Sequence, residues 1–93
     1  MGTIKYINKF KKDFKREKAG QLGKKVASLL NDTTDLLKVD EPLPDRYSDH
    51  QLSGNLSDCR ECHIRPDLLL IYRKPDDSSL ELVRLGSHSE LFG

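Results

Sequence analysis

Apolar residues recur at helical spacing in the first part of the chain, after a short stretch that alternates like a strand. Residues 3–7 alternate weakly and suit a strand. Asn8 then offers a side chain that caps helix N-termini. Ala19-Gly20 is typical of a helix end, because glycine fits the residue after a helix. The apolar face of this first predicted helix consists of Ile7, Phe10 and Phe14.

A second apolar stripe predicts a second helix that starts near Gln21. The residues from Asn31 to Asp35 carry short polar side chains that compete for backbone hydrogen bonds, so we expect the helix to break there. The segment Glu41-Pro42-Leu43-Pro44 cannot be helical and predicts an extended link. The stripe is formed by Leu22, Val26, Leu29, Leu30 and Leu37.

Beyond the link the pattern changes to that of strands. Residues 58–64, 68–74 and 80–85 predict three strands, separated by turns rich in Pro, Asp and Ser. The middle one is apolar without alternation, which is typical of a central strand covered on both faces. The order β-α-α-β-β-β predicts an α+β fold, with two helices packed on one face of a largely antiparallel sheet. At 93 residues, we expect one domain over 1–93.

Composition narrows the class of protein. The longest apolar run, Leu68 to Tyr72, is far shorter than the roughly 20 residues of a membrane helix. No apolar stretch typical of a secretory signal begins the chain, so we expect a cytoplasmic protein. The net charge of +1 hides an asymmetry: residues 1–38 have ten Lys/Arg and four acids (+6), and residues 39–93 have six and eleven (−5). The first half can offer a basic face to a polyanion, or merely a solvated helix surface.

The segment Cys59 to His63 matches the C-x-x-C-H pattern of haem attachment and resembles half of a zinc site. In a strand over 58–64, however, Cys59 and Cys62 point to opposite faces and do not converge on one ligand. We therefore expect two reduced thiols, one inward and one at the surface, and neither metal nor cofactor.

Histidines and carboxylates gather in the second half. Glu61 and His63 share one strand face, and the following turn folds Asp67 back toward His63. Imidazole titrates near neutral pH, and metal-free RNA cleavage needs a base, an acid and a cation for the phosphate. The alternative is a set of ordinary surface polar residues. The candidate catalytic residues are His50, Glu61, His63, Asp67, Arg84 and His88.

Three motifs resemble the YafQ-type branch of the RelE/ParE toxin superfamily. They are Asp49-His50-Gln51-Leu52-Ser53-Gly54, Arg60-Glu61-Cys62-His63-Ile64-Arg65-Pro66-Asp67 and Gly86-Ser87-His88-Ser89-Glu90-Leu91-Phe92. The resemblance implies a RelE-like microbial-ribonuclease-type fold and the toxin of a type II toxin–antitoxin module. Such toxins are ribosome-dependent mRNA endonucleases (mRNA interferases) that cut mRNA in the A site.

The resemblance also implies partners and roles. The partners are an antitoxin with a ribbon-helix-helix half, the 70S ribosome with its mRNA, and operator DNA only through the antitoxin. His50 or Asp67 is the expected base, His88 the acid, His63 a group that orients or shares proton transfer, and Arg84 the phosphate-binding cation. The residues expected to contact RNA or the ribosome are Phe92, Lys11, Lys12, Lys15, Arg16, Lys18, Lys24 and Lys25.

Two other functions remain open on the sequence alone. A ParE-like toxin inhibits a protein target such as gyrase without cutting RNA. A noncatalytic protein that binds RNA, or that only forms the antitoxin complex, needs no acid–base pair.

Overall fold

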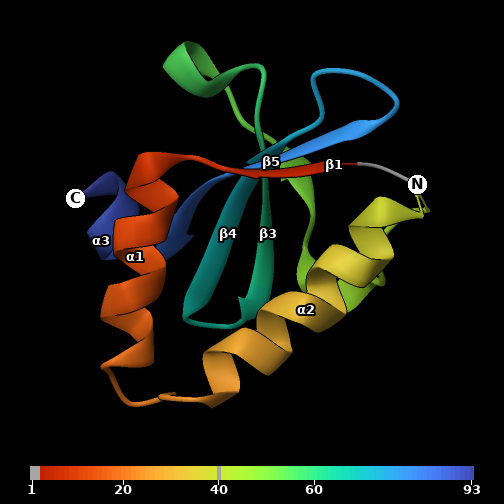
Figure 1. Ribbon diagram of the computed structural model, residues 1–93. Helices are drawn as coiled ribbons and strands as arrows, with labels where there is room; N and C mark the ends of the chain where they lie inside the picture. The colour runs from red at the N-terminus through yellow and green to blue at the C-terminus, as the bar shows by residue number, and fades with distance from the viewer. Residues whose placement is uncertain (1–2, 40) are drawn as a thin grey trace.

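A five-stranded sheet in the order β1-β5-β4-β3-β2 forms the centre of the molecule in the computed structural model, which describes residues 3–39 and 41–93 (Figure 1). Edge strand β1 pairs parallel with β5, and the other neighbours are antiparallel. The α+β prediction is confirmed. The elements are β1 (Thr3–Tyr6), α1 (Asn8–Lys18), α2 (Lys25–Lys38), β2 (His50–Gln51), β3 (Arg60–Arg65), β4 (Leu68–Arg73), β5 (Ser79–Gly86) and α3 (His88–Phe92), with 3-10 turns at Asp45–Tyr47 and Gly54–Leu56.

Strand β4 is buried on both faces, as its unbroken apolar run predicts. All five residues from Leu68 to Tyr72 are buried. Leu68, Leu70 and Tyr72 belong to the main core, whereas Leu69 and Ile71 lie on the other face. One strand therefore supports both the core and the opposite, polar face of the sheet.

Helices α1 and α2 cover one face of this sheet, and β3 and β4 are seen between them in Figure 1. Each fully buried Leu, Val or Phe side chain contributes roughly 1.5–3 kcal/mol to folding relative to its exposed state. Among the described residues, no helix is long and apolar enough to cross a membrane. The buried core consists of Phe10, Val26, Leu30, Leu37, Tyr47, Cys62, Leu68, Leu70, Tyr72, Leu80, Leu82 and Leu85.

The helix boundaries differ from the prediction in three places. Ile7 caps α1 and Asn8 is its first helical residue, with no side-chain cap bond. Helix α2 begins at Lys25 rather than near Gln21, because the chain turns at 21–24. The helix also continues through 31–35. The buried hydroxyls of Thr33 and Thr34 donate to the carbonyls of Leu29 and Asn31 inside the helix, so they do not break it.

Two short elements were missed by the sequence analysis. Strand β2 is too short to produce an alternating pattern, and it pairs only with Arg60 and Glu61. The C-terminal segment, expected as a short tail, forms α3. There Ser87 accepts a bond from the Glu90 amide, and the Glu90 carboxylate accepts one from the Ser87 amide, which makes a complete capping box.

Two bulges change the faces to which side chains point. Between β4 and β5 the register shifts, so that Tyr72 pairs with Leu82 while Ile71 pairs with Arg84. Between β3 and β4 a second shift pairs Arg65 with Leu68. Each bulge reverses the alternation that a regular strand would impose.

The buried carboxylate of Asp13 joins α1 to the end of β5. Asp13 is 3% exposed. It accepts hydrogen bonds from the Leu85 amide (3.0 Å), from Arg84 Nε (2.7 Å) and from Arg16 Nη1 (3.0 Å). Burial alone would raise the pKa of Asp13, but the bonds from Arg84 and Leu85 and the two positive charges lower it below its usual value.

We expect Asp13→Ala to lower the free energy of unfolding by about 3 kcal/mol at pH 7, because two guanidinium groups and a buried amide lose their acceptor. The folded-state pKa lies below the ordinary value of 3.8, so this stabilisation is complete above that pH and is lost as the pH falls through the folded-state pKa. Urea unfolding of both proteins at pH 7 and pH 3 measures the difference. Asp35→Ala, on an exposed position of α2, is the control. An equal loss at both pH values contradicts this role.

Candidate active site

The polar face of the sheet carries two rows of side chains that cross the strands. Residues directly opposite each other in an antiparallel pair point to the same face. The first row runs from β2 to β5 through His50, Glu61, Ile71 and Arg84. The second runs from β3 to β5 through His63, Leu69 and Gly86. This face is opposite to the one that α1 and α2 cover.

Glu61 lies between two of the three histidines. The residue is 5% exposed. Its Oε1 is 3.4 Å from His63 Nε2, and its Oε2 is 3.8 Å from His50 Nε2. The prediction that Glu61 and His63 share one face is confirmed, and β2 adds His50 to them. The Glu61 carboxylate is therefore placed to hold both imidazole rings in position.

The backbone of Ser48 orients His50. Ser48 has a φ of 47°, in the left-handed region that few residues other than glycine adopt. Its carbonyl oxygen lies 2.8 Å from His50 Nδ1. A carbonyl oxygen only accepts hydrogen bonds, so Nδ1 carries a proton. In the neutral ring Nε2 is then unprotonated and faces Glu61 and the open side of the sheet, as a general base requires.

Asp49 anchors β2 from the opposite face. Its carboxylate accepts bonds from Arg60 Nε (3.1 Å) and Nη2 (3.0 Å) and from the Tyr72 hydroxyl (2.6 Å). Burial, together with the bond to Asp49, raises the pKa of Tyr72 and keeps its hydroxyl a donor. This role of Asp49 was not predicted from the sequence, although the Asp-His dipeptide is a local signal for it: alternation sends Asp49 to one face and His50 to the other.

His88 is the first residue of α3 and is exposed. It follows Gly86 by two residues, and Gly86 lies in the same cross-strand row as His63. The His88 ring is 5.0 Å from that of Phe92, one helical turn later, with the ring planes at 43°. Phe92 is 41% exposed, so its ring has an open face.

Arg16 fastens α3 to the rest of the molecule. Its Nη2 donates to the Leu85 carbonyl (2.9 Å), and its Nε lies 3.2 Å from Glu90 Oε2. A Cβ atom on Gly86 would lie 2.7 Å from Arg16 Nη2, so glycine leaves the space that the guanidinium fills. Arg16 was expected on the RNA-binding face, but its guanidinium is bound within the protein.

Asp67 and Arg84 were predicted to join the histidines, but within the described residues neither forms an ion pair or hydrogen bond with one. Asp67 is exposed in the β3–β4 turn and lines a cavity of about 450 Å³ together with Ser87 and Glu90, beside the start of α3. Arg84 lies in the row of Glu61, but its guanidinium is bound to Asp13. The topology thus places Asp67 next to α3, and it places Arg84 across the sheet from His50.

The lysines of the predicted basic face are exposed. They belong to α1, to the segment before α2 and to the first residue of α2. Lys18 Nζ lies 5.5 Å from the centre of the Phe14 ring, which is a cation–π contact. The exposed set is Lys11, Lys12, Lys15, Lys18, Lys24 and Lys25.

Both cysteines are buried, which corrects the expectation that one lies at the surface. Cys59 is 1% exposed and Cys62 is 0% exposed. Strand β3 starts at Arg60, so Cys59 precedes it and strand alternation does not apply to it. Burial raises the pKa of the Cys59 thiol and raises that of Cys62 to about 12. Across residues 3–39 and 41–93, no group of three or more His, Cys, Asp or Glu side chains is arranged to hold a metal ion.

The known proteins that this chain resembles are bacterial toxins. The mRNA interferase toxin YafQ of Escherichia coli strain K12 is 38% identical over 90 residues, covering 97% of this chain and 95% of that protein. The crystal structure of an E. coli DinJ-YafQ complex matches with 34% identity and a TM-score of 0.83, over 100% of both chains. The crystal structure of a metal-bound toxin from Helicobacter pylori matches with 46% identity and a TM-score of 0.80, over 99% of this chain and 100% of that one.

The family described as "Bacterial toxin of type II toxin-antitoxin system, YafQ" matches residues 2–93. The matched range includes the sheet, the three helices, and Glu61 with the two histidines beside it, His50 and His63. The chain therefore belongs to the YafQ family of bacterial type II toxin–antitoxin toxins.

Proposed function

We propose that this chain is an endoribonuclease, an mRNA interferase that cuts mRNA in the ribosomal A site by general acid–base catalysis. The family match and the activity named for the E. coli relative support the reaction class. The observation that carries the proposal for this chain is the buried Glu61 carboxylate within 3.4 and 3.8 Å of two histidines. A protein that only blocks another protein has no need of this arrangement.

The reaction begins with attack of a 2′-hydroxyl on the adjacent phosphorus. His50 Nε2 takes the hydroxyl proton, since the Ser48 carbonyl fixes the proton of the ring on Nδ1. The new bond joins the 2′-oxygen to phosphorus, and the bond from phosphorus to the 5′-oxygen breaks. The products are a 2′,3′-cyclic phosphate and a 5′-hydroxyl. Asp67, the alternative base, lies farther along the β3–β4 turn.

His88 protonates the departing 5′-oxygen. It is exposed at the start of α3, where an imidazole can reach a bound substrate. His63, held 3.4 Å from Glu61, orients the substrate or shares proton transfer. Arg84 remains the proposed phosphate-binding cation only if its guanidinium leaves Asp13, to which it is bound in this structure. Phe92 stacks on a nucleotide base, a contact that contributes about 1–3 kcal/mol where it forms.

The proposed partners follow from this reaction. The E. coli relative is seen in complex with DinJ, and we assign this chain a corresponding antitoxin of the ribbon-helix-helix type, which alone contacts operator DNA. The exposed lysines of α1 and of the segment leading into α2 contact phosphates of ribosomal RNA. The site of action is the cytoplasm, where mRNA is translated.

Replacing His50, His63 or His88 with Ala should lower cleavage by about 10²–10⁴-fold, because each removes a proton-transfer group. Primer extension on a defined mRNA in a purified translation mixture, with and without ribosomes, measures the cuts. Melting temperatures should stay within a few degrees of the wild type, since His50 and His88 are exposed and His63 is half-buried. Intact mRNA with wild-type protein, in a strain whose growth the protein still inhibits, contradicts the proposal and points to a protein target.

Gly86→Ala should lower cleavage about tenfold, because its Cβ displaces the Arg16 guanidinium and releases α3 with His88. Arg16→Ala should have a similar effect. The double variant should lose no more cleavage than Arg16→Ala alone, since both changes break the same Arg16–Glu90 contact that holds α3. Lys5→Ala, on the outer strand β1, is the charge control. Additive losses in the double variant contradict this function of Arg16.

A further inference from the structure

The arginines of the chain divide into two groups. Of the six in the sequence, four are bound by carboxylates within the protein: Arg16 by Asp13, Glu17 and Glu90, Arg60 by Asp49, Arg73 by Asp58 and Glu81, and Arg84 by Asp13. Within the described part of the chain, Arg46 and Arg65 have no carboxylate partner. Both are exposed. Their charges are therefore available to a ligand.

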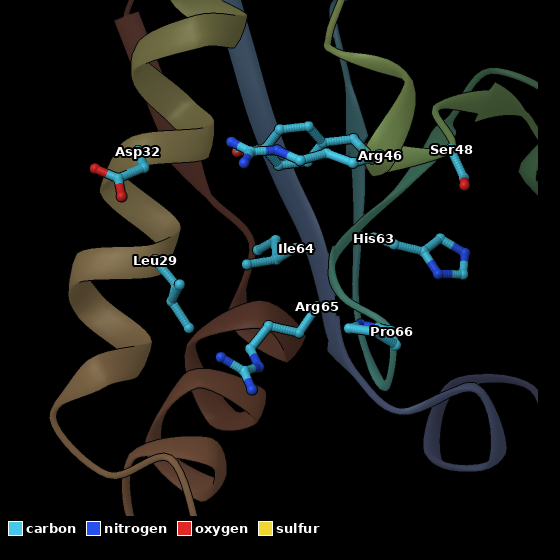
Figure 2. Close-up of a pocket in the computed structure, with 9 residues that line it drawn as sticks. Leu29, Asp32, Arg46, Ser48, His63, Ile64, Arg65 and Pro66 are labelled. Carbon is cyan, nitrogen blue, oxygen red and sulfur yellow. Dashed lines mark hydrogen bonds between the residues drawn. The ribbon is translucent and has the colours of Figure 1, made fainter.

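These two arginines line the same cavity. It has a volume of about 570 Å³ and lies between β3, α2 and the 3-10 turn at Asp45–Tyr47. Figure 2 shows both guanidinium groups on the α2 side of β3, with the His63 ring on the other side of the strand. Asp32 on α2 is the only acid among the lining residues. Two positive charges against one negative charge favour an anionic ligand.

Local structure places each arginine in the cavity. The bulge at the end of β3 pairs Arg65 with Leu68, whose side chain faces the main core, so Arg65 points to the α2 side instead of sharing a face with His63. Arg46 lies with its guanidinium carbon 5.0 Å from the centre of the buried Tyr47 ring. Stacking on a fixed ring lowers the freedom that the side chain loses when it binds.

Guanidinium groups suit phosphate oxygens, because their planar set of donors can make two parallel hydrogen bonds to one phosphate. His63 also lines this cavity. Strand β2 pairs only with Arg60 and Glu61, so within the described residues no strand covers the β3 edge from His63 onward. A nucleotide chain leaving the His50–Glu61–His63 face can pass over His63 into the cavity, which lies beside the 3-10 turn at Asp45–Tyr47.

We propose that Arg46 and Arg65 bind backbone phosphates of the mRNA next to the phosphate that is cut. This proposal rests on the proposed endonuclease function, and it assigns to the same site the residues that hold the single-stranded RNA substrate. An RNA ligand is favoured over an acidic peptide because the cavity shares His63 with the cluster at which the RNA reacts. The contact carries no base specificity, since phosphates are the same in every sequence.

Single-turnover cleavage on ribosomes programmed with a defined mRNA tests this inference. Arg46→Ala and Arg65→Ala should each raise the toxin concentration for half-maximal rate about fivefold, and the rate at saturation should stay close to that of the wild type. The dependence of this concentration on salt should become shallower, by a slope of about 0.7 for each lost contact to a single strand. Lys5→Ala, on the opposite edge of the sheet, should change neither quantity.

Replacing single phosphates of the mRNA by neutral methylphosphonates identifies the ligand. A methylphosphonate on one flank of the cut should raise the half-maximal concentration of the wild type about fivefold. The same substitution should not raise that of the Arg46→Ala or Arg65→Ala protein any further. If, at every flanking position, the effect of the methylphosphonate adds to the effect of the arginine substitution, the inference is overturned, because the arginines then contact ribosomal RNA or another partner. Unchanged half-maximal concentrations in both variants also overturn it, with the endonuclease function intact. Absence of cleavage by the wild type instead refutes the proposed function itself.

Discussion

The carboxylate of Asp13 is the contact on which the arrangement of the site depends. It accepts hydrogen bonds from the Leu85 amide and from Arg84 and Arg16, and so it joins the first helix to the last strand. Arg16 extends this connection to Glu90 and α3. A buried carboxylate without such donors would be strongly destabilising. Here the Asp13 carboxylate is satisfied, and it holds α1, β5 and, through Arg16, α3 in fixed positions. The position of His88 relative to the sheet follows from this network.

The site itself is built around a second buried carboxylate, that of Glu61. The neighbouring strand β4 is apolar on both faces. Its buried residues Leu69 and Ile71 lie directly opposite His63 and Glu61 on the same face of the sheet. Asp49 and Ser48 hold β2 from the other side and determine how the His50 ring is turned. The His50 ring is therefore oriented by the Ser48 carbonyl, in a segment that Asp49 holds through its own hydrogen bonds, as catalysis without large rearrangement requires.

Unbroken apolar runs and alternating patterns in the sequence predicted much of the sheet and part of the site. The apolar run of β4, and the two-residue spacing of Glu61 and His63, depend only on local geometry and were predicted correctly. The predicted break at 31–35 was wrong because buried threonine hydroxyls can bond within the helix. The ends of α1 and α2 shifted because capping by Asn8 and a start at Gln21 are weak local preferences that packing overrides.

Contacts between distant residues were not predictable in this way. Nothing in the local sequence shows that Asp13 meets Arg84, that Arg16 meets Glu90 or that Asp49 meets Tyr72. The bulges also send Arg84 and Arg65 to faces that regular alternation would not assign. The histidines and Glu61 were therefore predictable as candidate residues from the sequence. The groups that position them, and the division of the arginines into bound and unbound, were seen only in the structure.

The central claim is that the buried charge of Glu61 organises the two histidines for RNA cleavage. The most direct test is the single-turnover cleavage rate of Glu61→Gln on programmed ribosomes, compared with the wild type under saturating toxin. Glutamine has nearly the same shape but carries no charge, so packing is retained. The account predicts a rate lower by about 10²-fold or more, with an unchanged melting profile. A Glu61→Gln protein that cuts as fast as the wild type would contradict it.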